Sequence, residues 1–197
     1  MSKLIYLIRH GHSLHNDLYT KLGMSAFTLP EVTDSPLTQN GIKQADLLRR
    51  TFDKDIDLIL VSPLSRALQT AHIVFGQSDI PIICEEFLRE YPLGHQTCNK
   101  RSDIEVMKIQ YPRIQFNIES NKDIFWKHTP ETMDELNTRI EKTKEYLLNL
   151  SEKKIAIVGH SSFIGQLKDN HIKYIENGEK ELQHCFPYEY ILHKNNI

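Results

Sequence analysis

The stretch Lys3-Leu4-Ile5-Tyr6-Leu7-Ile8-Arg9-His10-Gly11 indicates both the fold class and the chemistry of the protein. Its first part is a mostly aliphatic run, which is typical of a buried strand in a parallel sheet. In an open α/β sheet, ligand sites lie beyond the carboxyl ends of the strands. There Arg9 can clamp an anion and His10 can act as nucleophile or base. Gly11 permits a sharp turn and a close approach to a ligand. A surface Arg-His pair at a strand end is the alternative.

A similar arrangement occurs in the second half of the chain. Residues 154–158 have another buried-strand pattern, and His160 and Ser161 follow after one glycine. The next residues have the apolar spacing of a helix. Because parallel strands bring their carboxyl ends to one edge of a sheet, we expect His160 to share a site with His10. A strand-end histidine held only by the backbone is the alternative.

A third strand is expected at residues 57–61, where Ser62-Pro63 ends it. Proline suits the first turn of a helix and Ser62 is a good N-cap, so the sequence predicts a helix over 63–76. Arg66 lies near its start, where a positive charge opposes the helix dipole. A bound anion would explain this position, and a solvated surface arginine is the alternative.

The rest of the pattern alternates strands and helices and predicts an α/β fold with a mainly parallel central sheet and helices on both faces. We expect one domain over 1–197, with the polar, irregular segment 85–129 inserted over the active site. Thr38 and Thr129 are the expected caps of two helices. For segments 11–37 and 170–180 the sequence predicts only loop or short helix. The expected strands are 3–10, 57–62, 81–84, 154–159, 182–186 and 188–193; the expected helices are 38–52, 63–76, 102–110, 130–150 and 161–169.

Taken together, several motifs resemble the histidine phosphatase superfamily in its phosphoglycerate mutase-like branch. Their order and spacing extend through almost the whole chain, which makes the combination specific although each piece alone is not. The matching stretches are Arg9-His10-Gly11-His12-Ser13-Leu14-His15-Asn16, residues 34–45, residues 62–71, Leu88-Arg89-Glu90, Glu131-Thr132 with Arg139, and Val158-Gly159-His160-Ser161.

The resemblance implies that His10 attacks phosphorus and becomes a phosphohistidine. It implies that Arg9, Arg66 and His160 line the phosphate pocket. Phosphoryl transfer depends mainly on positioning and on stabilising charge, which two guanidinium groups and a second imidazole can supply without a metal or another cofactor.

The resemblance also implies that Glu90 protonates the leaving oxygen and then activates water. Asn16 and Ser161 lie in the matching motifs and are expected to contact the substrate. Seen without the resemblance, any glutamate in this region could be a solvated surface charge. Glu86 and Glu131 are therefore the alternative acids.

Departures from the family pattern favour hydrolysis over mutase chemistry. The segment 90–102 lacks the acid-aromatic-glycine loop of the mutases, and Trp126 is followed by lysine and histidine rather than by two arginines. His15-Asn16 and the Cys98-x-x-Arg101 loop are closer to the phosphatase members. We therefore predict a phosphatase, a phosphoric monoester hydrolase, with a cofactor-dependent phosphoglycerate mutase as the alternative.

Two further alternatives come from the residues themselves. His10-x-His12-x-x-His15 has spacing that could suit a metal-dependent hydrolase, although no aspartate accompanies it. The second alternative is a non-catalytic binding protein on the same fold. Such a protein would not require Arg66 and Glu90 together with the histidines.

Composition limits the partners. The 197 residues are 40% hydrophobic and 25% charged with a net charge of −2, which is ordinary for a globular protein and gives no support to a nucleic-acid surface. A phosphorylated small molecule or a phosphoprotein is the expected substrate. A basic cluster (Lys100, Arg101, Lys108 and Arg113) reads as a solvated face, or alternatively as a site for a second anionic group on the substrate.

Cysteine content and hydropathy suggest a cytoplasmic location. Cys84, Cys98 and Cys185 are few, odd in number and widely spaced, which indicates a reducing compartment. The N-terminal apolar run is too short for a signal peptide, and no apolar run is long enough to span a membrane. The sequence leaves the oligomeric state open, with a homo-oligomer among the alternatives.

Overall fold

A six-stranded sheet with the order β4-β3-β2-β5-β1-β6 forms the centre of the protein. The computed structural model describes residues 2–172 and 182–194. Strands β1 to β5 are parallel to their neighbours, and β6 runs antiparallel to β1 at one edge. The strands are β1 (Ser2–Arg9), β2 (Leu58–Val61), β3 (Ile82–Glu85), β4 (Ile114–Asn117), β5 (Lys154–Gly159) and β6 (Pro187–His193).

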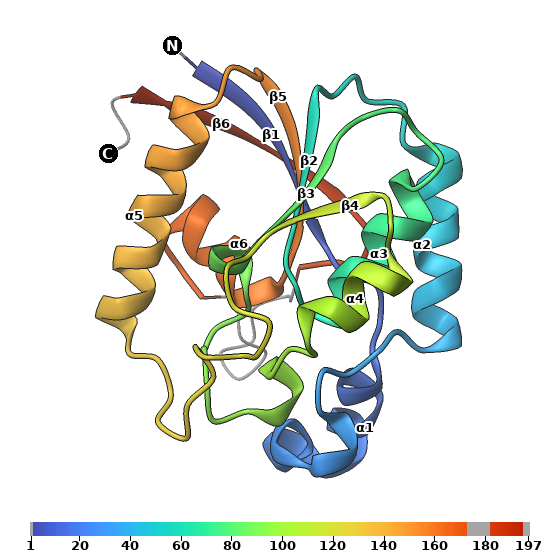
Figure 1. The fold of residues 1–197 in the computed structure, drawn as a ribbon, viewed down its shortest axis with the longest axis vertical. Coiled ribbons are helices and arrows are strands. Elements are labelled where there is room, and N and C mark those ends of the chain that lie inside the picture. The colour runs from blue at the N-terminus through green and yellow to red at the C-terminus, as the bar shows by residue number, and fades with distance from the viewer. Residues whose placement is uncertain (1, 173–181, 195–197) are drawn as a thin grey trace.

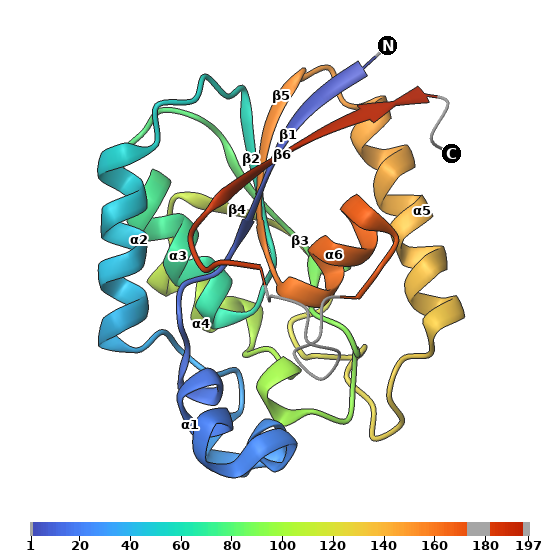
Figure 2. The same cartoon turned by 180° about the vertical axis from the view of Figure 1, so that it is seen from behind.

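Helices cover both faces of this sheet, with α2, α3 and α4 on one side and α5 and α6 on the other (Figures 1 and 2). Helix α1 and the short helix after it lie beyond one end of the sheet (Figure 1). The α-helices are α1 (Leu14–Leu22), α2 (Gln39–Thr51), α3 (Ser65–Phe75), α4 (Ile104–Gln110), α5 (Met133–Asn149) and α6 (Ser161–Asp169). The 3₁₀ helices are η1 (Gly23–Thr28), η2 (Pro30–Val32), η3 (Glu86–Leu88) and η4 (Thr97–Asn99).

Alternation along β1 shows how one strand serves two cores. Successive side chains of a strand point to opposite faces of the sheet. Tyr6 and Ile8 pack with residues of α2, α3 and α4, whereas Ile5 and Leu7 pack with residues of α5 and α6. The apolar run is therefore continuous because both faces of the strand are buried. The predicted α/β class with helices on both faces is confirmed.

Helix α3 begins later than the sequence predicts. Its first residue is Ser65, and Ser62 does not cap it. Instead Asp34, from the segment before α2, accepts hydrogen bonds from Ser65 N and Ser65 Oγ, both at 2.8 Å. The Ser62 hydroxyl lies 2.7 Å from Nε2 of His160. A distant carboxylate has thus replaced the local cap, which leaves Ser62 available to the neighbouring strand end.

The predicted cap at Thr129 is also wrong, because α5 begins at Met133 with Thr132 as its N-cap. Thr132 Oγ1 accepts from Glu135 N, and Glu135 Oε2 accepts from Thr132 N at 2.8 Å. This reciprocal capping box satisfies two backbone donors, which Thr129 cannot do. The cap at Thr38 is confirmed, since its hydroxyl accepts from Gly41 N.

Two further segments differ from the expectation. The segment 85–129 contains β4, which adds a parallel edge strand beside β3 and buries Ile114. In the segment 182–186, the described residues form no strand beyond an isolated bridge between Arg9 and His184. Most of the segment 170–180 lies outside the described residues. No described helix is long and apolar enough to cross a membrane.

Two glycines bring the end of β1 against the start of α2. A Cβ added to Gly11 would lie 2.6 Å from Gly41 O, and one added to Gly41 would lie 2.0 Å from His12 O. Thr38 N also donates to His12 O at 2.9 Å. The turn that follows His10 therefore rests directly on the backbone of α2.

We predict that Gly41→Ala destabilises the protein by about 1–3 kcal/mol, as overpacking of a filled interior does. The sign of the change in unfolding free energy is informative, since alanine inside a helix otherwise stabilises a protein by about 1 kcal/mol relative to glycine. Denaturant unfolding measures the effect. Asn40→Ala, at the neighbouring exposed position, is the control and should change stability little. A Gly41→Ala protein as stable as the wild type would contradict the close packing.

Candidate active site

Sheet topology brings the sequence-predicted histidines together. His10 follows β1 and His160 follows β5, and these strands pair in parallel with Arg9 opposite Gly159. His10 N donates to Gly159 O at 2.9 Å. The two imidazole centroids are 5.2 Å apart, and both side chains are buried. The parallel register thus makes a pair of neighbours from residues far apart in sequence.

The surroundings of His10 fix its tautomer. Nδ1 lies 2.7 Å from Gly11 O, to which it can donate, and Nε2 accepts from Arg66 Nε at 3.2 Å. A carbonyl can only accept, so the proton belongs on Nδ1 and the lone pair on Nε2. Burial, helped by the positive charge of Arg66 and by His160, holds the pKa of His10 well below its ordinary value. The ring is therefore a neutral imidazole.

Arg66 lies at the start of α3, and only 1% of the residue is exposed. Its NH1 group donates to Cys98 O at 2.6 Å, and its NH2 group donates to Asn99 Oδ1 at 2.8 Å. Two of its nitrogens are thus held by η4, and Nε faces His10. The predicted solvated alternative for Arg66 is wrong. Burial lowers its pKa, against the opposing influence of Glu90 and Asp34.

Arg9 is also buried, with NH1 donating to Leu182 O at 2.7 Å. His160 Nε2 is 2.7 Å from Ser62 Oγ, while its Nδ1 atom has no hydrogen-bond partner in the part of the chain that the structure describes. The same holds for Ser161 Oγ. Buried polar atoms normally have hydrogen-bond partners. Ser161 lines the cavity in front of His10, whereas the predicted pocket residue His160 is not among its lining residues.

Glu90 lies against the first turn of α6. Its Oε1 accepts from Tyr91 N at 2.8 Å and from Phe163 N at 3.1 Å, and its Oε2 accepts from Ser162 N at 3.4 Å. Burial raises the pKa of Glu90, although these N–H groups and Arg66 oppose the rise. The carboxyl group is therefore a better proton donor near neutral pH than an exposed glutamate.

The two alternative acids are engaged elsewhere. Glu86 accepts from Arg89 and Arg101, and Glu131 forms an ion pair of 2.7 Å with Arg139. Neither lines the cavity in front of His10, whereas Glu90 does. The geometry thus favours Glu90 among the acids that the sequence left open.

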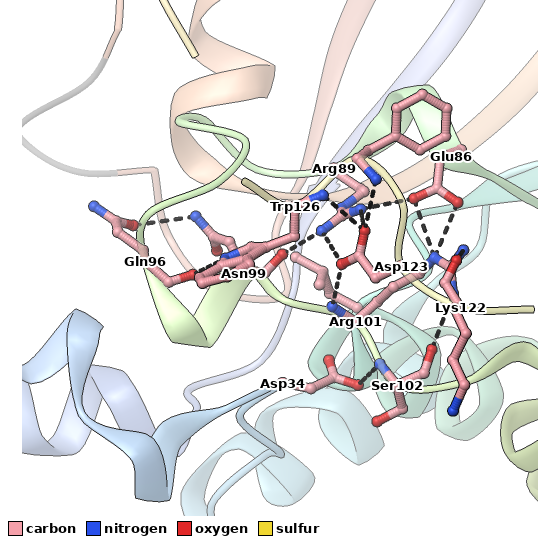
Figure 3. Close-up of polar contacts among 12 residues, drawn as sticks. Asp34, Glu86, Arg89, Gln96, Asn99, Arg101, Ser102, Lys122, Asp123 and Trp126 are labelled. Carbon is pink, nitrogen blue, oxygen red and sulfur yellow. Dashed lines mark hydrogen bonds and ion pairs between the residues drawn. The ribbon is translucent and has the colours of Figure 1, made fainter. Parts of the chain in front are cut away.

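A buried ionic network holds η4 in place (Figure 3). Arg89 donates to both carboxylate oxygens of Asp123, at 2.8 and 2.7 Å, and also to Asn99 O. Asp123 accepts in addition from Arg101 N at 3.0 Å. Although burial alone would raise it, these hydrogen bonds lower the pKa of Asp123. Since Asn99 contacts Arg66, the network fixes one side of the guanidinium.

A cavity of about 320 Å³ opens in front of His10. Its described lining contains the predicted Arg9, Arg66, Glu90, Asn16 and Ser161. Asn16 Oδ1 accepts from Ser13 N and Oγ, so its amide nitrogen remains available to a ligand.

The lining also contains residues that the sequence did not single out for this site. Among them are His184, Tyr19, Phe27 and Asn99. His15 and Cys98 also line the cavity; the sequence had marked both as features of the phosphatase-like pattern, and His15 also as a possible metal ligand. His184 Nδ1 lies 2.6 Å from His10 O, and burial lowers its pKa to about 3. Only the i, i+4 spacing of His15 and Tyr19 could have indicated a shared face.

The basic cluster does not line the cavity. Arg101 is buried and bonded to Glu86, which corrects the expectation of a solvated side chain there. Lys100 lies over the ring of Trp126 at 4.8 Å, and Arg113 donates to Ser78 O.

The histidines of the metal alternative have separate partners. His12 Nδ1 is 3.0 Å from Thr38 Oγ1, and His15 Nδ1 is 2.8 Å from Ser35 Oγ. Within residues 2–172 and 182–194, no group of three His, Cys, Asp or Glu side chains has the arrangement of a metal site.

Comparisons with other sequences agree with the motifs. The model of the histidine phosphatase superfamily (branch 1) matches residues 5–179. "Phosphoglycerate mutase-like protein 1" of Arabidopsis thaliana is 36% identical, over 82% of this chain and 69% of that protein. "Probable phosphoglycerate mutase GpmB" of Yersinia pestis is 28% identical, over 91% of this chain and 79% of that protein.

Comparisons with solved structures show the same fold. The alpha-ribazole phosphatase from Shigella flexneri superposes with a TM-score of 0.62 at 21% identity, covering 92% of this chain and 87% of that chain. The ecdysone phosphate phosphatase of Bombix mori, solved in complex with tungstate, superposes with a TM-score of 0.61 at 18% identity, covering 95% of this chain and 88% of that chain.

We predict that Asp123→Ala destabilises the protein by about 3–5 kcal/mol, because it leaves the buried charge of Arg89 without its carboxylate partner. Denaturant unfolding measures the loss. Asp55, which is 80% exposed and pairs with Lys154, provides the control. Asp55→Ala should cost no more than about 1 kcal/mol. Equal small losses in both variants would show that the network does not hold this region.

Proposed function

Because the chain belongs to the histidine phosphatase superfamily (branch 1), we propose that it hydrolyses phosphomonoesters through a phosphohistidine on His10. The contact between Arg66 Nε and His10 Nε2 carries the proposal. With Nδ1 engaged by Gly11 O, the imidazole is neutral and its lone pair lies beside a buried cation. This is the environment that a nucleophile for a phosphate group needs.

The phosphate group binds among Arg9, Arg66 and His160. His160 Nδ1 and Ser161 Oγ, which have no hydrogen-bond partner among the described residues, give it further hydrogen bonds, and Asn16 offers its amide nitrogen. Hydrogen bonds to an ionised phosphate are roughly twice as strong as those between neutral groups. Arg66 Nε therefore transfers its hydrogen bond from the imidazole to a phosphate oxygen, which frees the His10 lone pair.

In the first displacement, the bond from His10 Nε2 to phosphorus forms while the ester P–O bond breaks. Glu90 gives its proton to the departing oxygen, which avoids a free alkoxide. In the second displacement, the Glu90 carboxylate accepts a proton from water as the water oxygen attacks phosphorus. The P–N bond breaks, inorganic phosphate leaves, and His10 returns to its neutral form.

The names of the sequence relatives favour a second candidate, a phosphoglycerate mutase. A mutase returns the phosphoryl group to the bound acceptor, whereas a phosphatase gives it to water. Incubation with 3-phosphoglycerate and a bisphosphorylated primer separates the two. We expect release of inorganic phosphate from a panel of monoesters to exceed isomerisation. Isomerisation faster than release would establish the mutase.

We predict that His10→Ala lowers turnover to less than about a thousandth of the wild-type rate, since it removes the nucleophile itself. Brief mixing of the wild type with a labelled monoester should give an acid-labile adduct on His10. His193→Ala, at an exposed histidine of β6, is the matched control and should keep both turnover and adduct. An active His10→Ala protein, or a label on serine, would contradict the mechanism.

We predict that Glu90→Gln slows hydrolysis of an alkyl phosphate by about a hundredfold or more, because the poor leaving group needs the proton. A nitrophenyl phosphate should still form the phosphohistidine and then accumulate it, since the base for the second step is missing. A burst assay shows the accumulation. Equal slowing of both esters without a burst would exclude Glu90, and Glu131→Gln then tests the next acid.

The expected pH dependence of activity follows from the lowered pKa of His10 and the raised pKa of Glu90. His10, with its lowered pKa, stays neutral well below pH 6.5, so the acid limb of activity lies on the acid side of that value. Glu90 must carry a proton, so activity on alkyl esters falls as pH rises through its raised pKa. We expect Glu90→Gln to lose this alkaline limb. A wild-type profile that is flat through the alkaline range would contradict the assignment.

A further inference from the structure

Away from the phosphate end, the cavity is bounded by a row of rings from α1 and η1. His15 lies next to His10, with centroids 6.0 Å apart, and Phe27 meets His15 edge-on at 5.4 Å. Tyr19 stacks on Phe27 at 5.3 Å with an interplanar angle of 8°. All of these line the cavity. The row extends outward from the nucleophile.

Local structure explains this row. His15 and Tyr19 are one helical turn apart on α1, so their side chains share a face. The backbone of His15 is tied to Ser35 Oγ at 3.1 Å, which anchors the start of the helix. Phe27 is held between two other rings, whereas Met24, which also lines the cavity, is 48% exposed. The wall is thus partly preformed and partly adaptable.

Charge is distributed unevenly around the cavity. Among the described residues of the lining, the Arg and Glu side chains are Arg9, Arg66 and Glu90, and no lysine occurs. All three lie at the phosphate end: Arg66 contacts His10, Arg9 directly precedes it, and Glu90 is held by the first turn of α6. A carboxylate or second phosphate on the alcohol part would meet rings and uncharged polar groups there. Burying such a charge without a partner is costly.

We propose that this cavity selects phosphomonoesters whose alcohol part carries an uncharged, apolar ring, which packs against Tyr19, Phe27 and Met24. The proposal rests on the phosphatase function proposed above. It makes those three side chains specificity-determining residues, separate from the groups that act on phosphorus. A volume of about 320 Å³ is near the lower end for small-molecule sites, which suits a compact ester rather than a folded protein surface.

The main comparison uses 2-phenylethyl and propyl phosphate, esters of primary alcohols of similar basicity, so that intrinsic reactivity does not decide the result. For the wild type we expect kcat/KM for 2-phenylethyl phosphate to exceed that for propyl phosphate by at least about tenfold. We expect 3-phosphoglycerate to be poorer than propyl phosphate. Turnover of no ester would refute the phosphatase function itself. If the protein hydrolyses these esters but prefers propyl phosphate or 3-phosphoglycerate, only the proposed selection for an apolar ring is overturned.

Variants locate the selection. Phe27→Ala should reduce the preference for the phenylethyl ester to less than about threefold, whereas Tyr19→Phe, which keeps the ring, should retain it. Phe125→Ala is the matched control, because this phenylalanine is 47% exposed and lies outside the cavity. An unchanged preference in Phe27→Ala would overturn the assignment. If that variant is unfolded, Phe27→Leu keeps an apolar side chain without the ring and should reduce the same ratio; an unchanged ratio there overturns it equally.

Discussion

The hydrogen bond from Arg66 Nε to His10 Nε2 is the interaction on which the rest of the site depends. A guanidinium that is 1% exposed must have its donors satisfied, and a carbonyl and an amide oxygen of η4 take two of its nitrogens. Nε is the nitrogen that reaches the imidazole. The backbone of η4 is in turn held by Arg89 through Asn99 O. The position of one nitrogen thus requires an ordered loop and a buried ion network behind it.

The features that the sequence predicted correctly are those set by local pattern and by the geometry of parallel sheets. Apolar runs ending in histidine predicted β1 and β5, and the rule that ligands bind beyond the carboxyl ends of strands placed His10 beside His160. Arg66 was found because its charge is unfavourable at the start of a helix. Glu90 needed the family resemblance, since nothing in its immediate sequence separates it from Glu86.

The features that the sequence did not reveal depend on contacts between distant segments. Ser62 has the residue type of a cap, but Asp34 reaches Ser65 across the fold and takes that role. Thr129 was predicted as a cap because it precedes Pro130, but the capping glutamate, Glu135, stands three residues after Thr132. Strand β4 is too short for periodicity to identify, and the ring of Phe27 reaches the cavity only through the path of η1.

The placement of Glu90 reconciles two requirements that usually conflict. A general acid needs a raised pKa, and burial supplies it. In the proposed mechanism, the carboxylate left after proton transfer then needs stabilisation. The N–H groups of Ser162 and Phe163 at the positive end of α6 provide it, together with the N–H group of Tyr91. Ser161 precedes Ser162 and Phe163 in the first turn of α6 and lines the cavity, so the helix terminus that holds the carboxylate also borders the proposed phosphate pocket. In the proposed mechanism, the N-terminus of α6 therefore lies beside both the proton donor and the phosphate group.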